Sequence, residues 1–540
     1  MGKIIKPTLV LYLAVMFSAC SDSFLDKQPY NKLSEASFWK DLNDAEAGLT
    51  SVYDVLQVSN TSMGWSAMAY FDMITPIGYN RPANSAKFRE IARGDHDGRN
   101  GAVNALWTNS YRGIVRANDF LTHIDDIEAI SENDQSRKQR YTAEARYLRG
   151  MFYFHLVDLY GGVPLFESVP KIEDQLAVRS SREEVMAFVI ADFDYAIANL
   201  PAVPTEIGRA TEGAARTMRA KVAMLEKDWQ TAIEQTTAVM GLGYTLQDNY
   251  ADIFKLENEN NSEVIFDIQY VSQNDAEPGA KFQKAFSNAS SQANGFSWIQ
   301  PTRWLLDKYE VIDPEPEYII EDNRISKEVY DYFEGKDPRL DANFLRPGAY
   351  FTDRENNDVL YPYQMQKYTL AATGMNMRKY VIEGKNETAS SNDSPLNWII
   401  LRYADVLLMR AEAEAEQRGG AANVPQDILD ATINVVRYRA SDLLPKYMAG
   451  SLTMEQIQDE YMRELPFEGW MYFNFRRWRL MHLNDGYQPK GLKITKKSVK
   501  LSGAPVLETR AFDESKHYIF PIPEQERDLA PNLEQNPEWE

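Results

Sequence analysis

The sequence predicts a mostly α-helical protein, a scaffold of about four tetratricopeptide-like helical pairs with a long, irregular, loop-rich insertion and a few short strands. Apolar residues recur at steps of three and four over much of the chain, as in amphipathic helices. Residues 209–246 hold two such helices within the length of about 34 residues that is typical of a tetratricopeptide repeat, and residues 403–440 repeat the arrangement. Between residues 270 and 396 this periodicity is lost.

The chain begins with the features of a secretion signal. Two lysines precede an apolar run over residues 9–17, and two small residues then lead to Cys20, the only cysteine. The run is shorter than the roughly 20 apolar residues that span a bilayer. We expect residues 1–19 to be a lipoprotein signal peptide, Cys20 to be acylated and residues 20–42 to form a lipidated leader. The alternative is a chance cysteine near an ordinary cleavage site.

Helical periodicity begins after this leader. Residues 43–59 place Ala47, Val52, Val55 and Leu56 near one face. The next clear stripe, over residues 141–160, consists of Leu148, Met151, Phe152, His155, Leu156 and Leu159. Two glycines at 161–162 end this helix, and residues 182–200 are expected to pair with residues 137–160. Because His155 lies on the apolar face, we interpret it as a buried core histidine.

The span 209–246 is the best-defined helical pair. Ala215, Met218 and Val222 lie on one face of its first helix, a turn follows at residues 227–228, and the second helix ends at Gly241. Residues 403–418 and 427–440 form a similar pair, separated by two glycines. A single helical pair cannot bury its apolar face, so several pairs should stack. We therefore expect residues 43–540 to form one domain.

The middle of the chain has a different character. Residues 270–396 are rich in proline, glycine, asparagine and aromatic residues, and the short run from Val264 to Tyr270 resembles a strand. Loops of this length are usually functional or disordered. Because the segment contains many large aromatic residues, we expect an ordered insertion laid over the helical core.

The charge balance excludes several classes of partner. The formal net charge is -21, and removal of residues 1–19, which contain two lysines and no acidic residue, gives -21 - 2 = -23. A chain this acidic does not attract nucleic acid or anionic lipid. Any membrane attachment must therefore come from the lipid on Cys20. A single cysteine also excludes disulfides within the chain.

No motif indicates catalysis, a metal or a cofactor. The five histidines are scattered, and none has the spacing of a metal-binding helix. The Asp95-His96-Asp97-Gly98 segment lacks the later ligands of a calcium loop, so we interpret it as a polar turn. Acidic residues are abundant, but no pair stands out as the carboxylates of a glycoside hydrolase. We expect a protein without catalytic residues, while a surface-anchored helical hydrolase stays an alternative.

Several segments, in order along the chain, resemble the SusD/RagB family of Bacteroidetes outer-membrane nutrient-binding lipoproteins. The segments are the stretch after Cys20, Phe38-Trp39, Trp107 to Asn118, Ala143 to Pro164, Lys227 to Tyr244, Leu401 to Glu414, Ile433 to Ala440, Glu464 to Trp478 and Tyr518 to Pro537. Each match is modest, but together they span nearly the whole mature chain.

This resemblance implies a function as well as a fold. Members capture oligosaccharides at the cell surface, anchored in the outer membrane by their lipid. They deliver these to a SusC-like TonB-dependent β-barrel transporter, and some relatives bind peptides instead. A third possibility is a scaffold whose helical repeats bind only protein. No cofactor is implied.

Two loop regions combine aromatic platforms for sugar faces with polar groups for hydroxyls. In this family the glycan site is generally built from an early loop and the mid-chain insertion. The candidate ligand-binding residues are Trp65, Tyr70, Asp72, Tyr79, Asn80 and Arg81 in the early loop, and Asn294, Phe296 and Trp298 in the insertion. The alternative for each aromatic residue is that it packs its loop onto the helices. Trp39, Trp107, Trp229 and Trp478 are expected to be structural.

Overall fold

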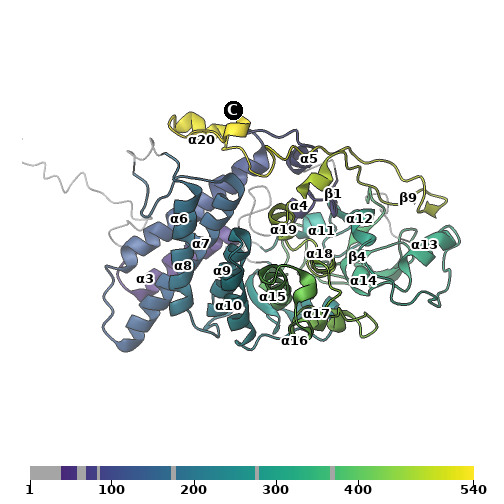
Figure 1. Ribbon diagram of the computed structural model, residues 1–540, viewed down its shortest axis with the longest axis horizontal. Helices are drawn as coiled ribbons and strands as arrows, with labels where there is room; N and C mark the ends of the chain where they lie inside the picture. Colours follow the sequence, from purple (N-terminus) through teal and green to yellow (C-terminus); the bar gives the residue numbers. More distant parts are fainter. Residues whose placement is uncertain (1–37, 58–67, 82–85, 172–177, 274–278, 365–370) are drawn as a thin grey trace, which may run out of the picture.

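The computed structural model describes residues 38–57, 68–81, 86–171, 178–273, 279–364 and 371–540. Long helices fill one half of the molecule, and short helices, short strands and irregular segments fill the other half (Figure 1). The predicted mostly helical architecture with a few short strands is confirmed. Within the described residues, no helix has the length and apolar character needed to cross a membrane. The boundaries of the leader and of the single domain stay predictions.

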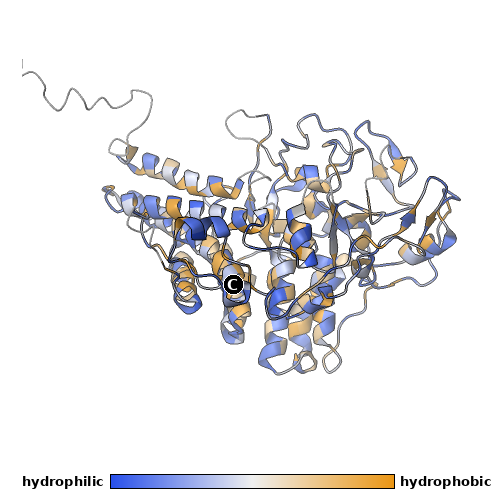
Figure 2. Cartoon of the chain, turned by 90° about the horizontal axis from the view of Figure 1, so that it is seen from above, coloured by the Kyte–Doolittle hydropathy of each residue, from blue (hydrophilic) through white to orange (hydrophobic). Residues whose placement is uncertain are grey.

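The long helices pack in succession along the chain. They are α3 (Leu42–Gln57), α6 (Gly101–Ile124), α7 (Glu132–Tyr160), α8 (Arg182–Asn199), α9 (Glu212–Glu226), α10 (Trp229–Met240) and α15 (Tyr403–Gln417). Helices α3 and α7 both contact α6, and from α7 onward each helix in this list contacts the next, so the predicted pairs stack as a repeat array should. Hydrophobic and hydrophilic residues alternate along most of these helices, as Figure 2 shows.

Local signals set the ends of these helices. Ser131 and Ser181 each accept a hydrogen bond from a backbone N–H in the first turn of the helix that follows, in capping boxes that begin α7 and α8. Helix α7 ends at Gly161, whose φ of 74° favours glycine. Lys227 adopts the left-handed conformation between α9 and α10, and the Asp228 carboxylate caps α10. The turn predicted at residues 227–228 is therefore confirmed.

Two helical expectations need correction. Ala47 is exposed, because the buried face of α3 runs through Ala45, Leu49 and Val52 instead. The helix expected over 427–440 is interrupted at Thr432, whose φ of -128° and ψ of -100° separate α16 (Gln426–Ala431) from α17 (Ile433–Ala440). His155 is buried as expected, and its Nδ1 lies 3.0 Å from the Met151 carbonyl oxygen.

The insertion begins and ends on paired strands. Strand β2 (Val264–Ile268) is antiparallel to β8 (Trp398–Arg402), so residues 270 and 396 lie close together. The other strand pairs are β1 (Gly78–Asn80) with β3 (Ile299–Pro301), β4 (Phe344–Leu345) with β7 (Asn376–Met377), β5 (Tyr350–Thr352) with β6 (Asp358–Leu360), and β9 (Lys493–Ile494) with β10 (Val499–Lys500).

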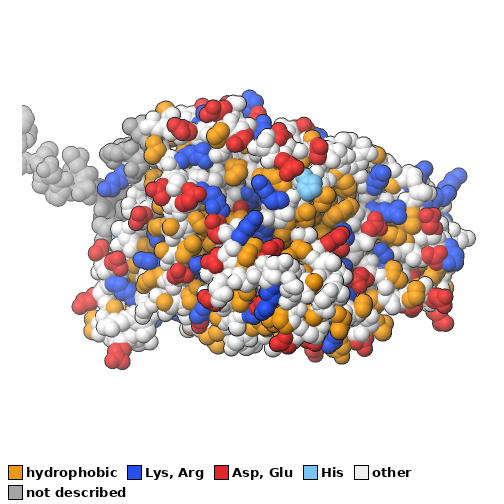
Figure 3. Space-filling model, in the orientation of Figure 1, with side chains coloured by type: hydrophobic (Ala, Val, Ile, Leu, Met, Phe, Trp, Pro, Cys, Tyr) orange, Lys and Arg blue, Asp and Glu red, His pale blue; other side chains and the backbone are white. Residues whose placement is uncertain are grey.

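Short helices connect these strands and the long helices. They are α4 (Ala69–Asp72), α5 (Ala86–Arg93), α11 (Gln283–Phe286), α12 (Arg303–Leu306), α13 (Lys327–Phe333), α14 (Arg339–Asn343), α18 (Met454–Glu464), α19 (Met471–Arg477) and α20 (Glu524–Leu529), with 3₁₀ turns η5 (Tyr250–Phe254), η6 (Leu256–Asn258), η8 (Ala421–Asn423), η9 (Met481–Asn484) and η10 (Pro537–Trp539). Basic and acidic side chains are interspersed over the face seen in Figure 3.

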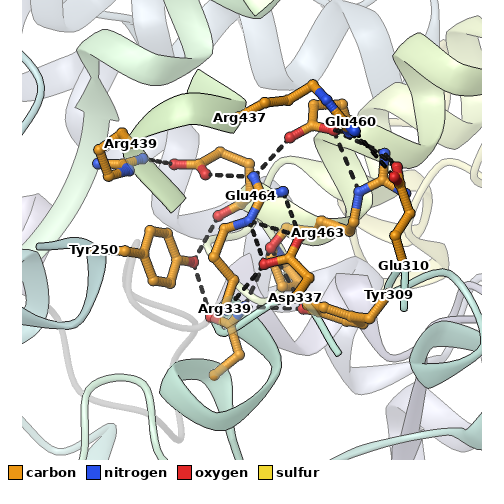
Figure 4. Close-up of polar contacts among 12 residues, drawn as sticks. Tyr250, Tyr309, Glu310, Asp337, Arg339, Arg437, Arg439, Glu460, Arg463 and Glu464 are labelled. Atoms are coloured by element: carbon orange, nitrogen blue, oxygen red, sulfur yellow. Dashed lines mark hydrogen bonds and ion pairs between the residues drawn. The ribbon is translucent and has the colours of Figure 1, made fainter. Parts of the chain in front are cut away.

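A buried network of charges joins strands and short helices that are far apart in the sequence. It consists of Glu263, Glu310, Asp337, Glu460, Glu464 and Glu468 with Arg339, Lys379, Arg402, Arg437, Arg439 and Arg463, so six acidic groups face six basic ones. Figure 4 shows its centre, where Arg339 from α14 meets Glu460 and Glu464 from α18. Of the acidic groups, all except Glu310 have side chains that are at most 5% exposed. We call these twelve residues the ionic network.

Glu460 illustrates how the ionic network is balanced. Its carboxylate accepts hydrogen bonds from Arg339 at 2.7 Å, from Arg437 at 2.8 Å and from Arg463 at 2.7 Å. Burial favours the neutral acid, but the Arg339, Arg463 and Arg437 guanidiniums outweigh burial and lower the pKa of Glu460 to about 2. The carboxylate is therefore charged at neutral pH, and its removal leaves buried guanidiniums without a counter-charge.

We predict that Glu460→Gln lowers the free energy of unfolding at pH 7 by about 3–5 kcal/mol, the usual cost of breaking a buried ion pair. With an unfolding entropy of about 2.1 cal/mol/K per residue, this loss lowers the melting temperature by roughly 3–5 °C. Differential scanning calorimetry measures the shift. Glu387→Gln is the matched control, because Glu387 pairs with Lys385 at the surface, where its side chain is 78% exposed.

The pH dependence of the stability difference distinguishes the contribution of the Glu460 charge from that of the shape of the side chain. Because the folded pKa lies below the ordinary value of about 4.3, the carboxylate stabilises the fold above pH 4.3, and this contribution is lost as the pH falls toward 2. The difference in melting temperature between the wild type and Glu460→Gln should therefore narrow over that interval. A difference that stays constant from pH 7 to pH 3 would contradict the assignment.

Candidate ligand-binding site

The two loop regions singled out in the sequence meet in the structure. Strand β1 lies at the end of the early loop region, β3 directly follows Trp298 of the insertion, and the two strands pair with Asn80 opposite Ile299. Just beyond the pair, the Arg81 backbone N–H donates to the Trp298 carbonyl oxygen at 3.0 Å. The Arg81 guanidinium donates to the Phe296 carbonyl oxygen at 3.2 Å. Segments more than 200 residues apart therefore form one surface.

Two aromatic rings stack on this surface. The centroids of the Phe296 and Trp298 rings are 5.8 Å apart, and the ring planes meet at 15°. Phe296 is 40% exposed, whereas Trp298 is only 8% exposed and supports Phe296. Asn294 is exposed beside them. Lys284 from α11 places its Nζ 5.8 Å from the Phe296 centroid and 5.7 Å from that of Trp298. We call Arg81, Lys284, Asn294, Phe296 and Trp298 the aromatic platform.

Backbone hydrogen bonds hold the loop of the aromatic platform against α11. The N–H of Phe296 donates to the Lys284 carbonyl oxygen at 2.9 Å, and that of Trp298 donates to Ala285 at 2.8 Å. Asn294, at a φ of 48°, adopts a left-handed conformation that costs energy in a non-glycine residue. At Gly295 a Cβ atom would lie 2.3 Å from the Ser287 carbonyl oxygen, so only glycine fits. The loop is therefore fixed before any ligand arrives.

Four of the predicted site residues lie beneath this surface. Tyr70, Asp72, Tyr79 and Asn80 are each at most 4% exposed. The Tyr70 ring stacks on Phe88 with centroids 4.9 Å apart, and the guanidinium carbon of Arg89 lies 5.7 Å from the Tyr79 centroid. These side chains pack the early loop onto the core and do not present a surface to a ligand. The structure therefore brings Arg81, Asn294, Phe296 and Trp298 together, without these four.

Asp72 is a buried residue that connects α4 with the start of α19. Its carboxylate accepts hydrogen bonds from the backbone N–H groups of Gly469 and Tyr472, each at 3.1 Å, at the start of α19. Burial raises the pKa of this fully buried carboxyl to about 7, despite the two backbone donors. Asp72 thus joins α4 to the segment that follows the ionic network.

Trp65 and Cys20 lie outside the described residues, so their roles stay predictions. Of the tryptophans expected to be structural, Trp107 is 3% exposed, and the Trp478 indole donates to Glu412 at 2.7 Å. Trp39 and Trp229 are partly buried against the core. Among the described residues, no group of three or more His, Cys, Asp or Glu side chains could hold a metal ion.

The aromatic platform is distinct from the large hollow of the structure. A hollow of about 870 Å³ lies elsewhere, lined by Tyr250, Phe254, Arg378 and neighbouring residues, and no residue of the aromatic platform lines it. Sequence reasoning found four of the five residues of the aromatic platform and missed Lys284. The lysine lies in the irregular insertion, where no periodicity indicates which side chains share a surface.

Comparison with known proteins agrees with this architecture. The model of the SusD family matches residues 262–539, more than half of the chain, and a second model, described as "Starch-binding associating with outer membrane", matches residues 23–224. The SusD-like protein P25 of Formosa agariphila is 26% identical over 513 residues, covering 88% of this chain and 90% of the relative.

Two further relatives come from Bacteroides. The starch-binding protein SusD of Bacteroides thetaiotaomicron is 23% identical over 392 residues, with 66% of each chain covered. The crystal structure of a SusD-like carbohydrate binding protein from Bacteroides fragilis is 28% identical and superposes with a TM-score of 0.78, covering 92% of this chain and 100% of that one. With a family match over half its length and the same fold, this chain belongs to the SusD family.

Proposed function

We propose that this protein captures oligosaccharides on the aromatic platform, does not cleave them, and delivers them to a SusC-like TonB-dependent β-barrel transporter. Membership of the SusD family supports this proposal, as do the relatives described as starch-binding and carbohydrate-binding. Delivery to a transporter is inferred from the resemblance to the family.

The observation that carries the proposal is the exposed ring of Phe296, stacked on Trp298 where the early loop meets the insertion. A sugar ring presents an apolar C–H face, and an aromatic ring offers the flat apolar partner that this face needs. A ring that is 40% exposed and fixed on both sides by backbone hydrogen bonds loses little conformational freedom when a sugar binds.

Polar groups around Phe296 suit the hydroxyl groups of a sugar. The exposed amide of Asn294 offers a donor and an acceptor, and the Arg81 guanidinium has five N–H donors, of which one is used by the Phe296 carbonyl. A single exposed ring with a few polar neighbours supports weak affinity, because the entropy lost on association offsets much of the contact energy. Weak capture suits a protein that must release its cargo. Trp65 is proposed as a second ring of this site.

We propose that a lipid on Cys20 anchors the protein in the outer membrane, with the aromatic platform facing the extracellular side. The basic start, the short apolar run and the single cysteine support acylation. The family model that covers residues 23–224 is described as associating with the outer membrane, which agrees with this location.

Phe296→Ala is expected to weaken oligosaccharide binding by about 1 kcal/mol, or roughly fivefold in Kd, because the stacking surface is removed. Trp298→Ala should weaken binding at least as much, since Phe296 loses its support. Isothermal titration calorimetry with an oligosaccharide found on a glycan array measures both effects. Tyr438→Ala is the matched control, because Tyr438 is 64% exposed on α17.

Unchanged affinity in both ring variants would remove these rings from the site. Binding of peptides but of no sugar on the array would replace glycan capture with the peptide-binding alternative. Release of reducing ends from a polysaccharide panel by the purified protein would contradict the proposal that it does not cleave its ligand.

Metabolic labelling tests the membrane anchor. We expect radiolabelled palmitate to enter the wild-type protein and not the Cys20→Ser variant, because only the thiol of Cys20 can take the lipid. The variant should also be lost from the outer-membrane fraction. Equal labelling and equal fractionation of the two proteins would contradict acylation at Cys20.

A further inference from the structure

The aromatic platform carries two positive charges, those of Lys284 and Arg81. Lys284 contacts the two aromatic rings, and the Arg81 side chain donates to a neutral carbonyl oxygen. Among the described residues, no carboxylate lies within 4.0 Å of the Lys284 ammonium or of the Arg81 guanidinium. The arginines of the insertion differ, because each has a carboxylate within 4.0 Å: Arg346, for example, bonds Asp341 and Glu334, and Arg378 bonds Glu383.

The aromatic rings do not satisfy the charge of Lys284. Its Nζ lies 5.7–5.8 Å from the two ring centroids, close to the outer limit of about 6 Å for a cation–π contact. The ammonium therefore keeps hydrogen-bond donors available to a ligand. An arginine and a lysine beside stacked rings suit a carboxylate or sulfate group, because each of these side chains donates hydrogen bonds to such an anion.

The backbones of both cationic residues are held in place. The Lys284 carbonyl accepts from Phe296, and its neighbour Gln283 donates its side-chain amide to the Tyr380 carbonyl oxygen at 2.6 Å. Arg81 is fixed through its own N–H on the Trp298 carbonyl. Both cationic side chains therefore extend from fixed backbone positions of the platform. They also stand out on a chain whose formal charge is -21, which otherwise repels anions.

We propose that the aromatic platform selects oligosaccharides that carry negative charge, as uronic acid carboxylates or sulfate esters. This inference rests on the proposed capture of glycans and names the class of glycan. Phe296 stacks on the sugar ring, while Lys284 and Arg81 bind the acidic substituent. A neutral glycan gains the stacking contact but leaves both charges without a partner.

Calorimetry on a panel of tetrasaccharides tests the proposal. The panel contains tetragalacturonate, an alginate tetrasaccharide and a sulfated carrageenan tetrasaccharide, with maltotetraose, cellotetraose and laminaritetraose as neutral members. Methyl-esterified, carboxyl-reduced or desulfated forms of the acidic members keep the sugar chain and remove its charge. We expect at least one acidic member to bind about tenfold more tightly than its neutralised form at 50 mM salt. This ratio should fall toward one at 500 mM salt, where charges are screened within about 4–5 Å.

Variants locate the effect. Lys284→Gln and Arg81→Gln should each lower the ratio of the affinity for an acidic tetrasaccharide to the affinity for its neutralised form, and the decrease should be severalfold. Lys497→Gln, which removes an exposed lysine next to β10, should leave the ratio unchanged. The carboxylate and sulfate members of the panel reveal which anion is preferred, and either result supports the proposal.

The outcomes separate the two proposals. If only neutral tetrasaccharides bind, or if neutralised forms bind as tightly as acidic ones, selection for charge is wrong while glycan capture stands, provided that Phe296→Ala still weakens binding. If no member of the panel binds, both proposals are contradicted. If acidic members bind but Lys284→Gln and Arg81→Gln leave the ratio unchanged, the acidic group of the ligand binds elsewhere on the protein. The assignment to the aromatic platform is then wrong.

Discussion

The ionic network is the interaction on which the arrangement of this molecule depends. Arg402, at the end of β8, is buried and bonds Glu263 at 2.7 Å, Glu464 at 2.6 Å and Glu468 at 2.7 Å. One side chain thereby joins β8 to the start of β2 and to the segment after α18. Buried ion pairs often contribute little net stability, because desolvation of the charges offsets their attraction, but a pair with a missing partner is costly. We therefore regard the ionic network chiefly as a constraint that permits one packing of α14, α17 and α18 against the paired strands β2 and β8.

The ionic network connects with both sides of the aromatic platform. On one side, Lys379 bonds Glu468 at 2.7 Å, and the carbonyl of the next residue, Tyr380, accepts from Gln283, the neighbour of Lys284. On the other side, the Gly469 and Tyr472 N–H groups bind Asp72, which lies in α4, six residues before β1. The segment from Glu464 to Tyr472 thus positions both the insertion and the early loop, and the aromatic platform gains a rigid support.

Periodicity in the sequence predicted the helices, because the spacing of apolar residues over a short stretch of chain determines which of them share one face of a helix. The helices around the turn at residues 227–228 and the helix ending at Gly161 follow from such spacing and from caps. The charged residues of the ionic network have no such signal. Arg402, Glu464 and Glu468 lie in segments noted only for their likeness to a family, and their partners are far away in the chain. Similarly, nothing local distinguishes the buried Tyr79 from the exposed Phe296, since both are aromatic residues in loops.

A crystal structure of the protein with a bound oligosaccharide tests the account most directly. We expect a sugar ring packed on Phe296 with carbon atoms within about 4.5 Å of the ring, and Arg81, Lys284 or Asn294 bonded to its substituents. The backbone of the aromatic platform should match that of the free protein, because its hydrogen bonds are already made. An oligosaccharide bound in the hollow beside Tyr250 and Phe254, with the aromatic platform empty, would contradict the account.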